Sequence, residues 1–189
     1  MQSYKKFFLA VILIALALVA VFYYLGNLVP ANPNADKNQG EEPATRTYSN
    51  PNFGISLEYP SSWKPVVGKK EFRKIPLYYG GNDGFFGVDA LGANVTGQVS
   101  IDDVVRELVS DKSNPYGTSP SVSTPDEGKI EARLIVPSDN QPPEKNGEAA
   151  LVVKYPKPKR IGNNTFLFFM LYGDKVHFGD IISSFKLIE

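Results

Sequence analysis

The amino-acid sequence predicts an α+β fold in which a β-sheet is covered on both faces, behind a single N-terminal transmembrane helix. Three observations lead to this prediction. A charge-free apolar run near the N-terminus is long enough to cross a bilayer. Several later segments alternate apolar and polar residues, which is the pattern of half-buried strands. Residues 165–172 are apolar on both faces and therefore belong in the middle of a sheet that is covered on both sides.

The apolar run comprises Phe7 to Leu25, nineteen residues without charge, Gly or Pro. A helix of this length spans roughly 28 Å, about the thickness of the hydrocarbon core of a bilayer. Lys5 and Lys6 precede the run, and no basic residue follows it before Lys37. The positive-inside rule therefore places the N-terminus in the cytoplasm and the rest of the chain outside. We expect a single-pass protein of the cell membrane with an extracytoplasmic C-terminal domain.

A cleaved secretory signal peptide is the alternative interpretation of this N-terminus. The apolar cores of such signals are usually about 7–15 residues long and end at a site of small residues. The present run is longer, it ends in the bulky residues Phe22, Tyr23 and Tyr24, and the nearest candidate cleavage site, Val29–Ala31, fits poorly. A lipoprotein anchor is excluded because the chain has no Cys to acylate.

The region after the apolar run changes composition twice. Residues 30–45 contain three Pro and no large apolar residue, so they form a flexible linker with a root-mean-square reach of roughly 20–24 Å. The remaining residues have the usual size of one domain. The expected segments are a cytoplasmic N-terminus at 1–6, a transmembrane signal anchor at 7–29, the flexible linker at 30–45 and the extracytoplasmic domain at 46–189.

Alternation of apolar and polar residues marks the strands of the domain. Phe53, Ile55, Leu57 and Tyr59 alternate with smaller or polar residues until Pro60, which cannot donate to a sheet ladder and ends the strand. The domain is therefore expected to be rich in strands. The other expected elements are strands at 63–67, 74–79, 85–91, 129–136, 149–155 and 165–172, loops at 80–84, 113–128 and 138–147, and a short helix at 175–184 followed by residues 185–188.

Residues 100–110 predict the clearest helix. Ser100 is a good N-cap, and Asp102 and Asp103 lie in the first turn, where the helix dipole favours anions. Asp102 and Arg106 have the spacing of an ion pair on one face. The apolar residues share another face, which is expected to pack on the sheet: Ile101, Val104, Val105, Leu108 and Val109.

Two segments of the domain are similar to a known family. Residues 48–63, YSNPNFGISLEYPSSW, resemble the opening of the PsbP-like superfamily, and residues 180–186, DIISSFK, resemble its closing helix-to-strand segment. This superfamily includes the PsbP subunit of photosystem II and small bacterial extracytoplasmic domains of the PsbP/DcrB-like type. The resemblance implies an antiparallel β-sheet flanked by helices on both faces, an α/β/α sandwich. None of the family's binding motifs can be matched in this sequence, so the resemblance identifies no functional residue. The expected membrane anchor argues against a photosystem role.

Composition excludes several classes of function. The absence of Cys removes disulfides, thiolate nucleophiles, Fe–S clusters and thiolate zinc sites. The chain has 20 basic and 20 acidic residues, and two of the basic ones, Lys5 and Lys6, precede the anchor. The outer part is therefore slightly acidic, whereas a nucleic-acid-binding domain needs a basic surface. We expect no cofactor and no nucleic-acid partner.

Few residues offer catalytic or metal chemistry. His177 is the only His, no Gly-x-Ser-x-Gly elbow accompanies it, and we interpret it as a boundary residue of the terminal helix. Asn82, Asp83 and Asp89 could supply oxygen ligands for Ca²⁺, but their spacing does not fit an EF-hand loop and a tight turn explains them. We expect no catalytic residue and no metal ligand.

Two basic clusters are the candidate contact residues. They could touch anionic lipid headgroups or cell-wall polymers, although solvated strand ends explain them equally well. The first cluster is Lys69, Lys70, Arg73 and Lys74, and the second is Lys154, Lys157, Lys159 and Arg160.

The most economical function is therefore a non-catalytic binding or accessory module of a bacterial cell envelope. It would be held in the membrane by residues 7–29 and would act through contacts with a partner protein. The alternatives are an envelope hydrolase of unrecognised type and a solute-sensing domain. A hydrolase requires a concave pocket on which polar groups converge, and a solute sensor requires such a pocket lined with aromatic residues.

Overall fold

The structure is a computed structural model that describes residues 44–93, 99–125, 130–145 and 147–188. The chain divides into two compact units, and all of these residues belong to the second, Pro43–Glu189. The expected cytoplasmic segment, the membrane anchor and nearly all of the linker lie outside the described residues. Within those ranges, no helix is long and apolar enough to cross a membrane.

The domain consists of antiparallel sheets and two α-helices, which confirms the α+β class. The larger sheet has the strand order β3-β6-β7-β11-β10-β9-β8, the smaller has the order β1-β2-β12, and β4 and β5 form a separate hairpin. All pairings between the described strands are antiparallel. The elements are β1 (Thr45–Asn50), β2 (Ile55–Pro60), β3 (Lys64–Pro65), β4 (Glu71–Phe72), β5 (Ile75–Pro76), β6 (Tyr78–Gly80), β7 (Phe85–Ala93), α2 (Ile101–Val109), β8 (Ser121–Ser123), β9 (Ala132–Val136), the 3₁₀ turn η1 (Pro143–Lys145), β10 (Glu148–Ile161), β11 (Asn164–Asp174), α3 (Phe178–Ser184) and β12 (Lys186–Leu187).

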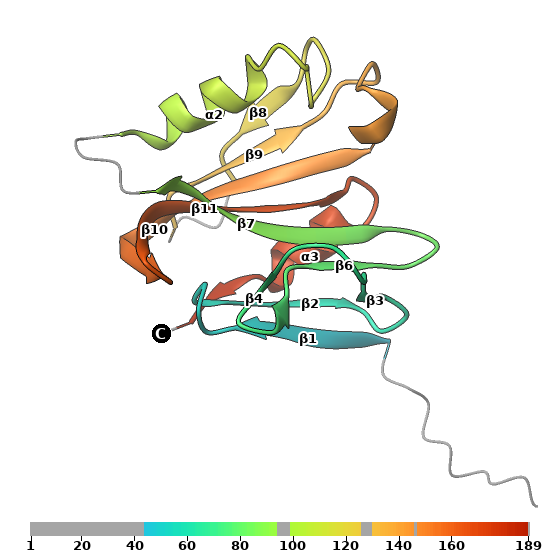
Figure 1. Cartoon of the computed structure of the whole chain (residues 1–189). Coiled ribbons are helices and arrows are strands. Elements are labelled where there is room, and N and C mark those ends of the chain that lie inside the picture. Colours follow the sequence, from blue (N-terminus) through green and yellow to red (C-terminus); the bar gives the residue numbers. More distant parts are fainter. Residues whose placement is uncertain (1–43, 94–98, 126–129, 146, 189) are drawn as a thin grey trace, which may run out of the picture. The chain divides into compact units, whose positions relative to one another are not determined.

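The larger sheet is covered on both faces, by different means (Figure 1). Helix α2 packs on one face, where Val105 joins Phe168 in an apolar core. The smaller sheet and α3 cover the other face, where Leu57 and Ile181 join Phe169 in a second core. The family resemblance implies helices on both faces of the larger sheet. The second face is instead covered mainly by the smaller sheet, together with α3. The doubly apolar strand β11 lies between β7 and β10 at the centre, as the sequence predicted.

Helix α2 begins as its sequence predicts. The Ser100 hydroxyl accepts a hydrogen bond from the Asp103 backbone N–H at 3.1 Å, and the Asp103 carboxylate accepts one from the Ser100 N–H at 3.3 Å. This reciprocal capping box satisfies two donors that a helix start leaves unpaired. The ion pairs differ from expectation. Arg106 pairs with Asp103, and Asp102 reaches Arg133 of β9 at 2.8 Å, which ties the helix to the sheet beneath it.

Strands β4 and β8 lie where no strand was expected, β8 within the expected loop 113–128. Two further strands, β10 and β1, differ from the expected pattern for identifiable reasons. Strand β10 continues to Ile161, well beyond the expected end at residue 155, because its pairing with β11 shifts register between Lys154 and Lys159 and the prolines of this stretch lie in the irregularity. Strand β1 was not predicted because its sequence is polar. It forms by pairing with β2, and it begins at Thr45, which the sequence analysis placed in the linker.

The turn between β1 and β2 is organised by Asn50, which is fully buried. Its side-chain carbonyl accepts hydrogen bonds from the backbone N–H groups of Asn52 and Phe53, at 3.1 and 3.3 Å. Its amide nitrogen donates to the Tyr48 hydroxyl at 2.8 Å. A buried polar side chain is tolerated here because all of these groups have partners.

Trp63 is fully buried between the sheet edge and the turn that precedes β7. Its indole N–H donates to the Asp83 carboxylate at 2.8 Å. A Cβ at Gly81 or Gly84 would lie 2.5 or 2.6 Å from the indole ring, so both glycines are needed for the ring to fit. The glycine-rich turn and the single Trp are therefore one packing unit.

We predict that Trp63→Ala lowers the free energy of unfolding by about 3–5 kcal/mol, the range for removing a buried large aromatic side chain. Trp63→Phe retains much of the ring and is expected to cost less. Urea unfolding followed by circular dichroism measures both values. A loss below about 1 kcal/mol for the Ala variant would contradict the burial of Trp63 in solution.

The buried tyrosines predict alkaline unfolding. Burial raises the pKa of the Tyr48 phenol from its ordinary value of 10.0 to about 12, and burial also raises the pKa values of Tyr116, Tyr155 and Tyr172. Because the folded pKa exceeds the unfolded one, the neutral phenols stabilise the fold fully below pH 10, and Tyr48 loses this contribution between about pH 10 and 12.

We therefore expect the unfolding free energy to be flat up to about pH 10 and then to fall. Tyrosinate absorbance and circular dichroism, recorded together during a pH titration, test this expectation. All ten tyrosines ionising near pH 10 with an intact fold would contradict it.

Candidate functional site

An apolar pocket lies where the smaller sheet ends. The smaller sheet has three strands and the larger has seven, so part of the face formed by β9 and β10 extends beyond the edge strand β12. The pocket between them has a volume of about 360 Å³. This volume falls in the range of protein sites that hold small ligands or a few side chains. The lining residues of this apolar pocket are Pro125, Ile130, Ala132, Leu151, Val153, Pro156, Ile182, Phe185, Lys186 and Leu187.

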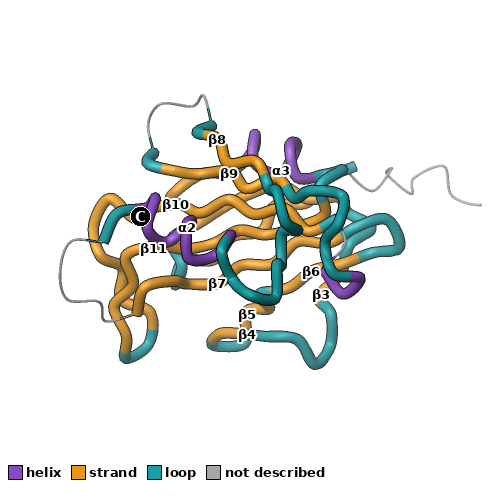
Figure 2. The backbone as a smooth tube through the Cα atoms, turned by 90° about the horizontal axis from the view of Figure 1, so that it is seen from above, coloured by secondary structure: helices purple, strands orange, loops and turns teal. Residues whose placement is uncertain are grey.

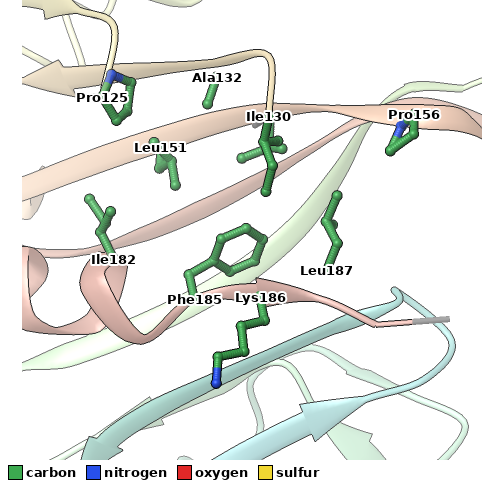
Figure 3. A pocket seen from close by; sticks show the side chains of 10 residues that line it. Pro125, Ile130, Ala132, Leu151, Pro156, Ile182, Phe185, Lys186 and Leu187 are labelled. Carbon is green, nitrogen blue, oxygen red and sulfur yellow. The ribbon is translucent and has the colours of Figure 1, made fainter. Parts of the chain in front are cut away.

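Nine of the ten lining residues are apolar. Figure 3 shows Phe185 and Leu187 pointing from the chain end toward Ile130 and Leu151 on the opposite wall. The ammonium group of Lys186 points away from the other lining side chains, so only its backbone and stem contribute to the wall. Among the described lining residues the pocket therefore presents mainly apolar surface, which suits binding by burial of apolar groups.

Strand β12 borders the pocket, and no other described strand pairs with its outer edge. The Ile188 N–H donates to the Gly54 carbonyl at 2.8 Å, and Lys186 is paired with Ser56. Hydrogen-bonded and non-hydrogen-bonded pairs alternate along an antiparallel ladder, so the N–H and C=O of Leu187 point away from β2. Since β12 is the last strand of its sheet, these groups face the open side.

His177 lies in a polar cluster with Trp63, Asp83 and Asp174, hereafter the His177 cluster. Its Nδ1 is 3.0 Å from Asp174 Oδ1, its Nε2 is 3.9 Å from Asp83 Oδ2, and its ring packs edge-on against Trp63 with centroids 5.3 Å apart. Asp174 also accepts backbone N–H groups of Phe85, at 3.4 Å, and of the residues that begin α3. The sequence predicts His177 as a boundary residue but gives no signal for its carboxylate partners, because they come from other elements.

The geometry of the His177 cluster fits a structural role. A hollow beside it contains Ser183 and Ser184, yet Ser184 lies two helical turns from His177, roughly 10 Å along the axis, which is too far for proton transfer. The Ser184 hydroxyl instead accepts from the Glu58 N–H and donates to the Ile181 carbonyl, both at 2.8 Å. In this arrangement the cluster holds the start of α3 on the Trp63 corner.

Metal binding is also disfavoured at the His177 cluster. The two carboxylates lie at opposite nitrogens of the imidazole ring, so no single ion can contact the ring and both carboxylates. Asp83 bonds Trp63, while Asp89 pairs with Lys70, so the residues considered for Ca²⁺ do not converge. In the part of the chain that the structure describes, no group of three or more metal-ligating side chains occurs.

Two of the eight predicted contact residues form ion pairs, and a third lies over an aromatic ring. Lys70 pairs with Asp89 at 2.7 Å, Lys154 pairs with Glu131 at 2.8 Å, and the ammonium of Lys69 lies 5.4 Å from the centre of the Tyr78 ring. The remaining five have no carboxylate of a described residue within ion-pair distance: Arg73, Lys74, Lys157, Lys159 and Arg160.

A second cavity, of about 330 Å³, combines aromatic and charged walls. Its cations lie beside carboxylates, and Lys145 pairs with Glu148 at 2.8 Å, so the cavity carries little net charge. It is the place that a solute-sensing function would use. Its lining residues are Lys69, Lys70, Tyr78, Phe85, Glu144, Lys145, Glu148 and Tyr172.

Comparison with known proteins gives one structural likeness of interest. No protein-family model matches the sequence, and no curated protein matches it. Among solved structures, the chain is similar to cyanobacterial PsbP (CyanoP) from Synechocystis sp. PCC 6803, with 15% sequence identity over 78% of this chain and 95% of that chain, and a TM-score of 0.39.

We predict that His177→Gln lowers the free energy of unfolding by only about 1–2 kcal/mol. The change removes the ring's packing on Trp63 and its hydrogen bond to Asp174, but it leaves the backbone N–H bonds to Asp174 intact. Asp174→Ala is expected to cost more, about 2–4 kcal/mol, because it leaves backbone donors at the α3 start unpaired. Denaturant unfolding of both variants tests this order. A larger loss for His177→Gln than for Asp174→Ala would contradict a structural role centred on Asp174.

Proposed function

We propose that this chain is a membrane-anchored extracytoplasmic binding module of a bacterial envelope, and that it acts without catalysis by docking a segment of a partner protein. The observation that carries the proposal is the apolar pocket beside the free edge of β12. The sequence supports the membrane anchor through residues 7–29 and a PsbP-like assignment through the resemblance of residues 48–63 and 180–186.

The pocket and the edge suit one binding mode. An extended segment that pairs with β12 would meet the outward N–H and C=O of Leu187, as in the addition of a strand to a sheet edge. Alternate side chains of a strand point to the same face, so every second residue of the segment would face β9 and β10. Apolar residues at these positions would fill the apolar pocket and bury Leu151, Phe185 and Leu187.

The apolar lining favours a binding module over an enzyme. Catalysis of hydrolysis requires a nucleophile or an activated water together with acid and base groups around one point. The apolar pocket offers none of these among its lining side chains. The His177 cluster has an imidazole and carboxylates, but the hydroxyls of Ser183 and Ser184 beside it are bonded to backbone groups.

The proposal predicts a contact that can be trapped in cells. A photoreactive amino acid at Leu187 of the full chain is expected to give one discrete cross-linked partner, and peptide mapping should locate the link in a segment with apolar residues at alternate positions. Adding Ile130→Glu places a charge in the pocket wall and is expected to abolish the adduct. Val67→Glu is the matched control, since Val67 is fully exposed and lies outside the pocket.

Two results would contradict the proposal. Adduct formation that is insensitive to Ile130→Glu, or equally sensitive to Val67→Glu, would show that the apolar pocket is not the contact. Turnover of a substrate that depends on His177 would favour the hydrolase alternative. Circular dichroism of each variant separates loss of contact from loss of fold.

A further inference from the structure

Five of the basic residues that have no carboxylate partner among the described residues are gathered at one end of the domain. Arg73 and Lys74 form the tip of the β4–β5 hairpin, with φ angles of 49° and 67°. Lys157, Lys159 and Arg160 lie in the last part of β10, before the turn into β11. We name this set of five residues the basic end.

Aromatic packing holds these two hairpins together. The Phe72 ring lies 3.5 Å from the position that a Cβ of Gly162 would take in the β10–β11 turn. The same ring packs edge-on against Phe53, with centroids 6.0 Å apart. Figures 1 and 2 agree in placing β4 beside the end of the β10–β11 hairpin. Two basic clusters that are distant in sequence are therefore brought to the same end of the fold.

The turn between β1 and β2 lies between the two groups of cations. Arg73 Nη1 is 3.5 Å from Asn52 Oδ1, and Lys159 Nζ is 2.7 Å from the position that a Cβ of Gly54 would take. Asn52 and Gly54 are two residues apart, so their Cα atoms are at most about 7.6 Å apart. The charged groups of the two clusters thus flank a single turn.

Within the two described hairpins that form this end, the cations outnumber the acids. Glu71 is the one acidic residue of the β4–β5 hairpin, and residues 156–164 contain three basic residues and no acid. Arg73, Lys74, Lys157 and Arg160 are exposed. Like charges held close together raise the local potential and attract polyanions more strongly than isolated cations do.

We infer that the basic end binds a linear polyanion of the envelope, a polymer that carries repeated phosphate or carboxylate groups. A flexible polymer can place successive anions on both hairpins, because the cations lie on two separate tips. This inference goes beyond the proposed protein contact, and it involves none of the apolar pocket's lining residues.

The exposed side chains of the basic end favour a polymer over the anchoring membrane. The basic end lies beyond Asn50, at the opposite end of β1 from Thr45. The large apolar residues most exposed in the described chain are Val67, Val122, Val136 and Val176, and none belongs to the two basic tips. Among the described residues, the two basic tips therefore present no strongly exposed large apolar side chain for insertion into a bilayer.

The test uses the full chain in nanodiscs of uncharged phosphatidylcholine, with linear inorganic polyphosphate as the probe. Binding is expected to weaken as salt rises, because exposed charges are screened. The combined variant R73Q, K74Q, K157Q and R160Q should weaken binding at least about tenfold. The matched control, K64Q, R106Q, K112Q and K175Q, removes the same charge from other exposed sites and should retain binding.

Each other outcome overturns the inference. Equal losses in the two variants would mean that net charge alone governs binding, and retention by the first variant would exclude the basic end. Binding of the chain to added phosphatidylglycerol vesicles without binding to polyphosphate would identify a lipid surface as the partner. Circular dichroism confirms that each variant is folded before binding is measured.

Discussion

The packing of the two sheets across the Phe86 ring is the contact on which the rest of the domain depends. Phe86 lies near the start of β7 on the larger sheet's inner face, and the rings of Tyr48 and Tyr59 from the smaller sheet lie 5.4 and 5.3 Å from its centroid. The Trp63 ring closes the same group at 6.3 Å. Because β12 pairs only with β2, the position of β2 over Phe86 also determines where the pocket opens.

The fold was predictable where local pattern and tertiary environment agree. The capping box at Ser100, the alternation that ends at Pro60 and the doubly apolar β11 all led to the correct elements. The misses have a common cause. Strand β1 is polar, and it forms through its pairing with β2. Strand β10 continues beyond its prolines because its pairing with β11 shifts register, and the local sequence pattern does not predict this shift.

The candidate site was less predictable than the fold. Leu151 and Phe185 have the appearance of ordinary core residues, and the pocket between them exists because a three-stranded sheet is narrower than the seven-stranded sheet beneath it. The roles of the basic residues depend in the same way on distant partners. Lys70 and Lys154 are neutralised by Asp89 and Glu131, and no spacing rule in the sequence indicates this.

The attachment of the chain through β1 has a mechanical consequence. The tether enters at Thr45 and β1 runs from there toward the basic end, antiparallel to β2 along its whole length. A load between the tether and a polymer held at the far end would act along the strand axis. Such a load shears the β1–β2 ladder, so its hydrogen bonds share the force and do not open one at a time. Under the proposed anchoring and polymer contact, this geometry would let the folded domain bear load while the linker before it supplies the give.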